Sequence, residues 1–132
     1  MKDHWDADRI ENSVGRNIPD VWFRFGGHNG FTGWIELKQI FRWNAKTHMS
    51  TKVPHFTAGQ KSWLYLNHRA GANTWVLLHV RLTDEYLFIP GSKVFRLGDC
   101  NRLEAFDLAY EVFHGMPSAA AARGILASKG EL

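Results

Sequence analysis

Two short apolar segments joined by a glycine-rich turn impose the strongest constraint on how this chain can fold. The segments span residues 19–25 and 31–38, and the turn between them reads Gly-Gly-His-Asn-Gly. Glycine and asparagine tolerate the positive φ of tight turns, so we predict two strands paired as a hairpin. Alternation along a strand puts Glu36 and Lys38 on one face. The hairpin brings Asp20 beside Glu36, so that two carboxylates and an amine converge.

Periodicity and capping residues predict the other elements. Thr57, followed by Gln60 three residues later, matches a helix capping box. The run 74–82 is almost continuously apolar, which is typical of a central strand covered on both faces. In chain order we expect a helix over 3–14, strands over 19–25 and 31–38, and a loop over 39–56. These are followed by a helix over 57–71, strands over 74–82 and 85–89, and a helix over 101–113. This order predicts an α/β fold with a central mixed β-sheet flanked by helices.

The totals favour one domain. The chain has 132 residues, of which 45% are hydrophobic, enough to bury a core. We assign residues 1–115 to the domain and 116–132 to a C-terminal tail, either a helix that docks on a partner or a frayed end. The single Cys100 excludes an internal disulfide. The polar N-terminus is unlike a signal peptide, and no apolar run approaches the roughly 20 residues that span a bilayer, so we expect a soluble cytoplasmic protein without a membrane partner.

Charge is distributed unevenly along the chain. Residues 39–83 contain no Asp or Glu but six Lys or Arg and four His, with Trp43 and Phe56 interleaved. A one-sided positive window of this kind indicates a polyanionic partner, most simply a nucleic acid. The alternative is a solvated basic face with no partner.

The charged hairpin end offers ligands for a hard divalent cation. Such cations take oxygen ligands at about 2.0–2.6 Å, which Asp20, Glu36 and the carbonyl of Leu37 could supply. A bound cation lowers the pKa of its water and stabilises charge on a phosphate, and Lys38 would lie beside that water. Glu11 is a further possible ligand or base. In the alternative, Asp20 caps a turn, and Glu36 and Lys38 form an exposed ion pair worth under about 1 kcal/mol.

This pattern resembles a known nuclease family. Ile18-Pro19-Asp20, then fifteen residues, then Glu36-Leu37-Lys38 is similar to the PD-(D/E)XK motif. Downstream, the stretch 55–63, the Ala-Gly-Ala turn at 70–72 and the strand from Trp75 are similar to the Gln-bearing helix, glycine turn and apolar strand of virus-type replication-repair nucleases (VRR-NUC) and Holliday-junction resolvases. The resemblance covers roughly residues 9–90.

The resemblance implies a restriction-endonuclease-like core and a role for each charged residue. Asp20 and Glu36 would be metal ligands, with the Leu37 carbonyl beside them, and Lys38 would be the catalytic lysine. Gln60 would support the active site, although the capping box alone also accounts for it. Glu11 would be an auxiliary acid. The alternative is that Glu11 is an ordinary helix glutamate that pairs with Arg9 or a lysine.

The function implied is a Mg²⁺-dependent endonuclease, with Mn²⁺ as a substitute, that cuts branched or junction DNA in recombination or repair. A bacterial or phage resolvase of this kind would act as a homodimer, so that two strands are cut. The alternatives are a restriction-like or nicking enzyme with the same core, and a non-catalytic nucleic-acid-binding module. The residues expected to contact DNA, mostly its backbone, are Arg9, Arg16, Arg42, Lys46, His48, Lys52, His55 and Lys61.

Overall fold

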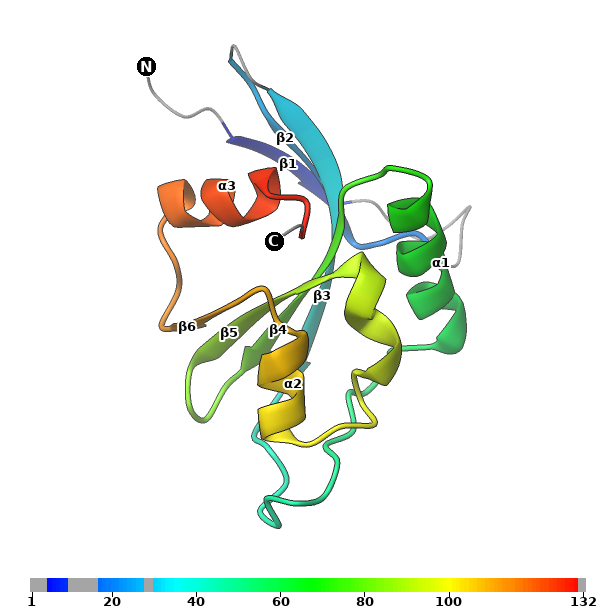
Figure 1. Ribbon diagram of the computed structural model, residues 1–132. Coiled ribbons are helices and arrows are strands. Elements are labelled where there is room, and N and C mark those ends of the chain that lie inside the picture. The colour runs from blue at the N-terminus through cyan, green and yellow to red at the C-terminus, as the bar shows by residue number, and fades with distance from the viewer. Residues whose placement is uncertain (1–4, 10–16, 28–29, 131–132) are drawn as a thin grey trace.

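The computed structural model describes the backbone of residues 5–9 and all atoms of residues 17–27 and 30–130. Its centre is a six-stranded sheet in which the strands lie in chain order. The third and fourth strands are parallel, and every other neighbouring pair is antiparallel. The expected α/β fold with a mixed sheet and flanking helices is therefore confirmed (Figure 1).

The elements of the structure have the following bounds. The strands are β1 (Trp5–Arg9), β2 (Val21–Phe25), β3 (Phe31–Ile40), β4 (Thr74–Val80), β5 (Glu85–Pro90) and β6 (Glu111–His114). The helices are α1 (Ala58–Arg69), the 3-10 helix η1 (Gly91–Arg96), α2 (Arg102–Leu108) and α3 (Ala119–Ala127). In the described part of the chain, no helix is long and apolar enough to cross a membrane.

Helices cover both faces of the sheet, and each face has its own core. On one face, Leu64 of α1, Val94 of η1 and Ala105 of α2 pack with Val76, Leu78 and other side chains of the central strands. On the opposite face, Ile125 and Leu126 of α3 pack with Phe23, Phe25 and Trp75. Figure 1 shows α3 on its own side of the sheet, with α1 and α2 on the other. Alternating side chains of every central strand thus enter two separate cores.

The parallel connection from β3 to β4 runs through α1, which begins as predicted. The Thr57 side chain accepts a hydrogen bond from the Gln60 backbone N–H, and the Gln60 side chain accepts one from the Thr57 N–H. This reciprocal capping satisfies two donors that a helix leaves unpaired at its start. Trp63 then packs edge-on against Trp34 of β3, with ring centroids 5.6 Å apart. The helix is thereby fixed beside the strand that carries Glu36 and Lys38.

Two predicted helices are partly wrong. Within the helix expected over 3–14, residues 5–9 form β1, which pairs along the whole of β2. Residues 3–4 and 10–14 lie outside the described residues. The helix expected over 101–113 ends at Leu108, and Glu111–His114 forms β6 against β5. In both cases a strand edge distant in sequence offers unpaired backbone groups, and pairing with it overrides the local helical pattern.

The C-terminal tail is helical and packs against the sheet. Ser118 caps α3, and Ile125 and Leu126 are buried in the second core. Asn73, at the entrance to β4, donates a side-chain hydrogen bond to the Leu126 carbonyl at 2.8 Å and accepts one from the Trp75 indole at 2.6 Å. A buried amide with both of its ends paired ties the C-terminal helix to the central strand.

Glu85 joins several segments at the start of β5. Its buried carboxylate accepts hydrogen bonds from the Trp43 indole at 2.7 Å, from the Thr83 hydroxyl at 2.7 Å and from the Arg102 guanidinium at 2.8 Å. Burial raises the pKa of Glu85, but these donors, Arg102 foremost, outweigh burial and leave the pKa below its usual value of 4.5. The loop 41–57 and α2 are therefore held to the sheet through one charged group.

We predict that Glu85→Gln lowers the free energy of unfolding by about 2 kcal/mol at pH 7, the usual cost of losing a hydrogen-bonded charge pair. Since the folded-state pKa of Glu85 is lowered, its contribution is present above pH 4.5 and is lost as the pH falls through the folded-state pKa. The difference between parent and variant in urea denaturation should therefore narrow on acidification. The exposed Glu111→Gln is the control, and equal loss in both variants would contradict the assignment.

Candidate active site

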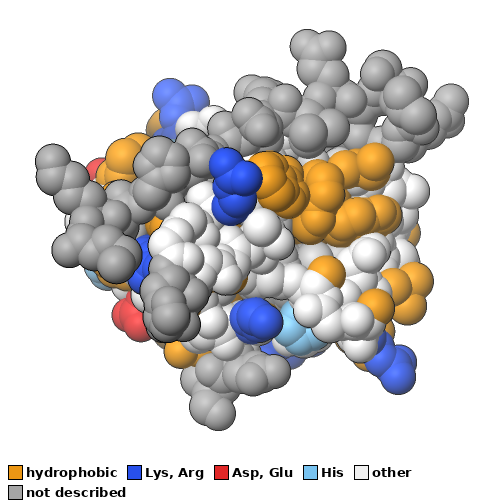
Figure 2. Space-filling view, turned by 90° about the horizontal axis from the view of Figure 1, so that it is seen from above, with side chains coloured by type: hydrophobic (Ala, Val, Ile, Leu, Met, Phe, Trp, Pro, Cys, Tyr) orange, Lys and Arg blue, Asp and Glu red, His pale blue; other side chains and the backbone are white. Residues whose placement is uncertain are grey.

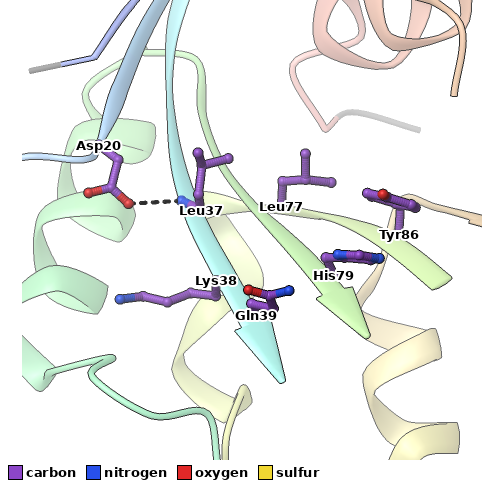
Figure 3. Close-up of a pocket in the computed structure, with 7 residues that line it drawn as sticks. All are labelled: Asp20, Leu37, Lys38, Gln39, Leu77, His79 and Tyr86. Carbon is purple, nitrogen blue, oxygen red and sulfur yellow. Dashed lines mark hydrogen bonds between the residues drawn. The ribbon is translucent and has the colours of Figure 1, made fainter. Parts of the chain in front are cut away.

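The candidate site lies where β2 and β3 separate. The last register pair between them is Val21 with Ile35, so β3 continues past Ile35 without a described partner on that side. Asp20, one residue before β2, fills the first position of this open edge. Its carboxylate accepts a hydrogen bond from the Leu37 backbone N–H at 3.2 Å (Figure 3). The expectation that Asp20 lies beside the Glu36 segment is confirmed.

The backbone carbonyl of Leu37 faces the same edge. The Trp34 N–H donates toward β4, to the Asn73 carbonyl at 2.8 Å. Backbone N–H and C=O groups of one residue in a strand point to the same side, and successive residues alternate. Leu37 therefore directs both groups away from β4, and its N–H reaches Asp20. The carbonyl oxygen of Leu37 thus points toward the strand edge at which Asp20 lies.

Glu36 is a buried acid with an unusual environment. Its side chain is 2% exposed, one oxygen lies 3.4 Å from the Lys38 amine, and the other, Oε2, is buried without a hydrogen-bond partner among the described residues. Burial, followed by the neighbouring Asp20 carboxyl, raises the pKa of Glu36 from 4.5 to about 8, although Lys38 acts in the opposite direction. Two carboxyl groups forced together in a low-dielectric setting carry more negative charge than one lysine offsets.

Lys38 is held in place by the segment that precedes α1. Its amine donates to the His55 carbonyl at 2.8 Å and lies 5.2 Å from the centre of the Phe56 ring. His55 has a φ of 61°, a left-handed conformation that is uncommon outside glycine. Strained backbone of this kind persists where the surrounding structure requires it, often at functional sites. In Figure 3 the Lys38 amine extends to the same side of β3 as Asp20.

The residues at this edge fit a hard divalent cation. Asp20 and Glu36 supply two carboxylates, the Leu37 carbonyl supplies a third oxygen, and within the described part of the chain Glu36 Oε2 has no hydrogen-bond donor. Mg²⁺ is commonly bound through one or two carboxylates while it keeps several waters. Among residues 17–27 and 30–130, no cluster of three or more His, Cys, Asp or Glu side chains forms a metal site. A cation here would therefore depend on the backbone oxygen and on water.

Two predicted site residues have structural partners. The Gln60 side chain is engaged in the capping box of α1, which accounts for its presence at that position. The Lys61 amine donates to the Leu97 carbonyl at 2.6 Å, beyond the end of η1, and lies 5.3 Å from the Phe56 ring. These contacts tie α1 to η1 and to the segment that holds Lys38. The catalytic role of Gln60 and the DNA contact of Lys61 stay predictions.

The loop 41–57, which connects β3 to α1 and is called the basic loop below, places its charged side chains at the surface. Thr51, at the centre of this loop, anchors it: its N–H donates to the Cys100 carbonyl at 3.0 Å, and its hydroxyl accepts from the Asn44 N–H at 2.9 Å. Arg9 lies in β1, where only the backbone is described, and Glu11 and Arg16 fall outside the described residues. The exposed residues of the predicted DNA surface are Arg42, Lys46, His48, Lys52 and His55.

Sequence reasoning missed the aromatic side of the site. His79 of β4 and Tyr86 of β5 stack with ring centroids 4.1 Å apart and planes 10° from parallel. Together with Gln39 they line the same hollow as Asp20 and Lys38 (Figure 3). The prediction that β4 is covered on both faces is wrong near its end, where Leu77 and His79 are only half-buried. A histidine within an otherwise apolar strand was the available signal.

Comparisons with protein-family models, with curated proteins and with solved structures found no match to this chain.

We predict that Glu36 titrates near pH 8 in the protein free of divalent cations, as followed by ¹³C NMR of its carboxyl carbon. Asp20→Asn should lower the pKa of Glu36 because it removes the adjacent acid, yet leave the pKa above 4.5 because burial remains. A Glu36 pKa near 4.5 in the parent protein would show that the two acids do not converge.

The same shift determines how Glu36 affects stability. Its folded-state pKa lies above the unfolded value, so between pH 4.5 and 8 the folded protein holds a proton that the unfolded chain has released. The Glu36 contribution therefore declines as the pH rises through this window. Glu36→Gln should flatten that decline in urea denaturation, whereas the exposed Glu111→Gln should leave it unchanged.

Proposed function

We propose that this protein is a Mg²⁺-dependent endonuclease that hydrolyses phosphodiester bonds in DNA, with the restriction-endonuclease-like core that its sequence motifs imply. One observation carries the proposal: Asp20, the Glu36 carboxylate, the Leu37 carbonyl and the Lys38 amine converge at a strand edge. Two adjacent acids lower the stability of the folded protein. A bound cation would offset their repulsion and would also bind the substrate phosphate. An exposed ion pair, the alternative weighed above, does not describe a Glu36 that is 2% exposed.

The proposed chemistry adds water across one phosphorus–oxygen bond. Asp20, Glu36 and the Leu37 carbonyl would hold Mg²⁺, which when bound lowers the pKa of its water and stabilises charge on the phosphate. The Lys38 amine, fixed by the His55 carbonyl and by Glu36, supplies a positive hydrogen-bond donor at the same edge. From there it orients the attacking water or binds a non-bridging phosphate oxygen. The proton released by the water passes to solvent, and the leaving oxygen takes one up.

Surface charge supports a DNA substrate. The exposed basic residues of the loop 41–57 follow β3 directly in the chain, so they extend from the strand that carries Glu36 and Lys38. Figure 2 shows the opposite end of the molecule, seen from above in Figure 1, where separate Lys and Arg side chains lie beside a hydrophobic patch, so the DNA contacts proposed here are those of the loop's own side chains. Contacts of this type bind the DNA backbone with little regard to sequence. Branched DNA and a homodimer complete the proposal, because two centres are needed to cut two strands.

We predict that Asp20→Asn and Lys38→Gln bind a four-way DNA junction like the parent but cut it roughly 100-fold more slowly or worse with Mg²⁺. Each variant removes a group at the reacting edge while it leaves the basic loop intact. The matched controls are the exposed Asp107→Asn of α2 and Lys93→Gln of η1, which should cut at the parent rate. Cleavage by both site variants at the parent rate would overturn the site.

A substrate panel separates the alternatives. With Mg²⁺ or Mn²⁺, preferential cutting of a junction or a flap over linear duplex and single strands supports structure selectivity. Efficient cutting or nicking of linear duplex favours the restriction-like alternative. Salt-dependent binding without cleavage of any substrate leaves the non-catalytic binding module and overturns the nuclease proposal.

We predict that Lys46→Gln and Lys52→Gln each weaken DNA binding and reduce the slope of log K against log salt by about 0.9 per lost phosphate contact. Fluorescence anisotropy over a salt series measures both effects. Lys129→Gln, beyond the end of α3, is the control and should leave the slope unchanged. Unaltered slopes in both loop variants would remove the loop from the DNA surface.

A further inference from the structure

The face of the sheet that carries α3 is only partly covered. Ile125 and Leu126 pack over Phe23, Phe25 and Trp75, toward the β2 side. Farther along the same face, Leu37 is 43% exposed and Leu77 of β4 is half-buried. Met116, in the segment that leads into α3, is 79% exposed. A half-open space is therefore left between the start of α3 and the ends of the central strands.

This space is an apolar pocket of about 330 Å³. Its walls include Ile35, Leu37, Leu77, Phe88, Met116 and Ala122, and no charged side chain lines it among the described residues. Volumes of this order accept drug-sized or smaller ligands, which apolar walls hold and a few polar groups orient. A ligand that fills this pocket would therefore be largely apolar.

The pocket opens directly onto the candidate active site. Leu37, Leu77 and Tyr86 line both this pocket and the hollow of about 340 Å³ that contains Asp20 and Lys38. Leu37 joins the two, because its carbonyl faces the Asp20 edge while its side chain forms a wall of the pocket. Gln39 and His79 line the hollow that contains Asp20 but not the apolar pocket; the imidazole stacks on Tyr86, and its Nε2 pairs with Asp84 Oδ1 at 2.9 Å. The apolar walls thus adjoin the Asp20 edge through Leu37, whose side chain lies on the face of β3 opposite to Glu36 and Lys38.

We propose that this pocket receives one unstacked nucleobase of the DNA strand being cut, a nucleotide next to the scissile phosphate. The inference rests on the proposed nuclease function. A base has apolar faces that Leu37, Leu77 and Tyr86 would contact, and a polar edge that Gln39 and His79 would meet. It is attached to a phosphate, which explains why an apolar pocket adjoins a phosphate-directed site. A purely aliphatic ligand would use neither the polar border nor that connection.

An unstacked base also gives a physical basis for substrate choice. Taking a base out of a duplex costs a few kcal/mol, and the cost is least where the base is already unpaired. DNA with an unpaired nucleotide at a branch point or a single-stranded flap would therefore fill the pocket more readily than an intact duplex. Structure selectivity would then arise at the pocket, separately from the backbone contacts of the basic loop.

The test combines a pocket-filling variant with abasic DNA. Ala122→Phe puts a ring into the pocket from α3, and Ala120→Phe puts the same ring on an exposed position of that helix. A branched DNA that the parent cuts is prepared with single abasic sites, one at a time, across the nucleotides that flank the cut. Binding is measured by anisotropy without divalent cations, cleavage with Mg²⁺, and oligomeric state by sedimentation.

The expected result is specific to one position. One abasic site should weaken binding to the parent and to Ala120→Phe by roughly 5- to 100-fold, the range for loss of one stacked base. Ala122→Phe should bind the intact DNA less well by a similar factor and be insensitive to that abasic site. 2-aminopurine at the same position should change fluorescence on binding to the parent but not on binding to Ala122→Phe. If Ala122→Phe does not fold, Met116→Glu replaces it, with the exposed Leu103→Glu as control.

Three outcomes overturn the inference, and they differ. If the parent neither binds nor cuts DNA, the proposed function and the base pocket fail together. If the parent cuts branched DNA but no abasic site has a localised effect, the base pocket alone fails. If the parent sediments as a dimer that Ala122→Phe dissociates, the pocket is an interface between two copies of the chain, and the base is excluded from it.

Discussion

The arrangement of the whole site depends on one hydrogen bond, from the Leu37 backbone N–H to the Asp20 carboxylate. It forms where β2 leaves β3, so a side chain replaces a strand partner at the exposed edge. An unpaired strand edge is normally a liability, and here it is closed by an acid. Because the Asp20 side chain takes the place of a strand partner, the Leu37 carbonyl faces the same edge, and Asp20 lies close to a second acid, Glu36. The arrangement of these oxygen atoms is therefore a consequence of how the two strands separate.

The closeness of the two acids lowers the stability of the folded protein, and the surrounding residues reduce this cost. Burial and Asp20 raise the pKa of Glu36 to about 8, so the cation-free site holds a proton instead of a second charge. Lys38 partly offsets this rise in pKa, and its amine also donates to the carbonyl of His55, a residue with left-handed backbone. The strain at His55 and the crowding at Glu36 are thus linked through one amine. Sites that bind charged ligands commonly retain such locally unfavourable features.

Features that depend on residues close together in the sequence could be predicted, whereas pairing between remote strands could not. Strand alternation put Glu36 and Lys38 on one face, and the Thr57 capping box predicted the start of α1. Both depend on residues within a few positions of one another. β1 and β6 were missed because their pairing partners are remote and override local helical patterns. The contact between Lys38 and His55 was missed as well, because positive φ at a histidine has no pattern that announces it.

The partial cover provided by α3 connects these observations. α3 begins only at Ala119, so it does not extend across the apolar face toward the ends of β3 and β4. Instead the chain turns at Met116 and Pro117, which leaves Leu37 and Leu77 accessible beside the charged edge. The exposed apolar surface and the two crowded acids each lower the stability of the folded protein, and they lie side by side. Both features involve Leu37, whose carbonyl faces the charged edge and whose side chain lines the pocket. Under the proposed function, Mg²⁺ would offset the two acids and a base in the pocket would cover the apolar surface.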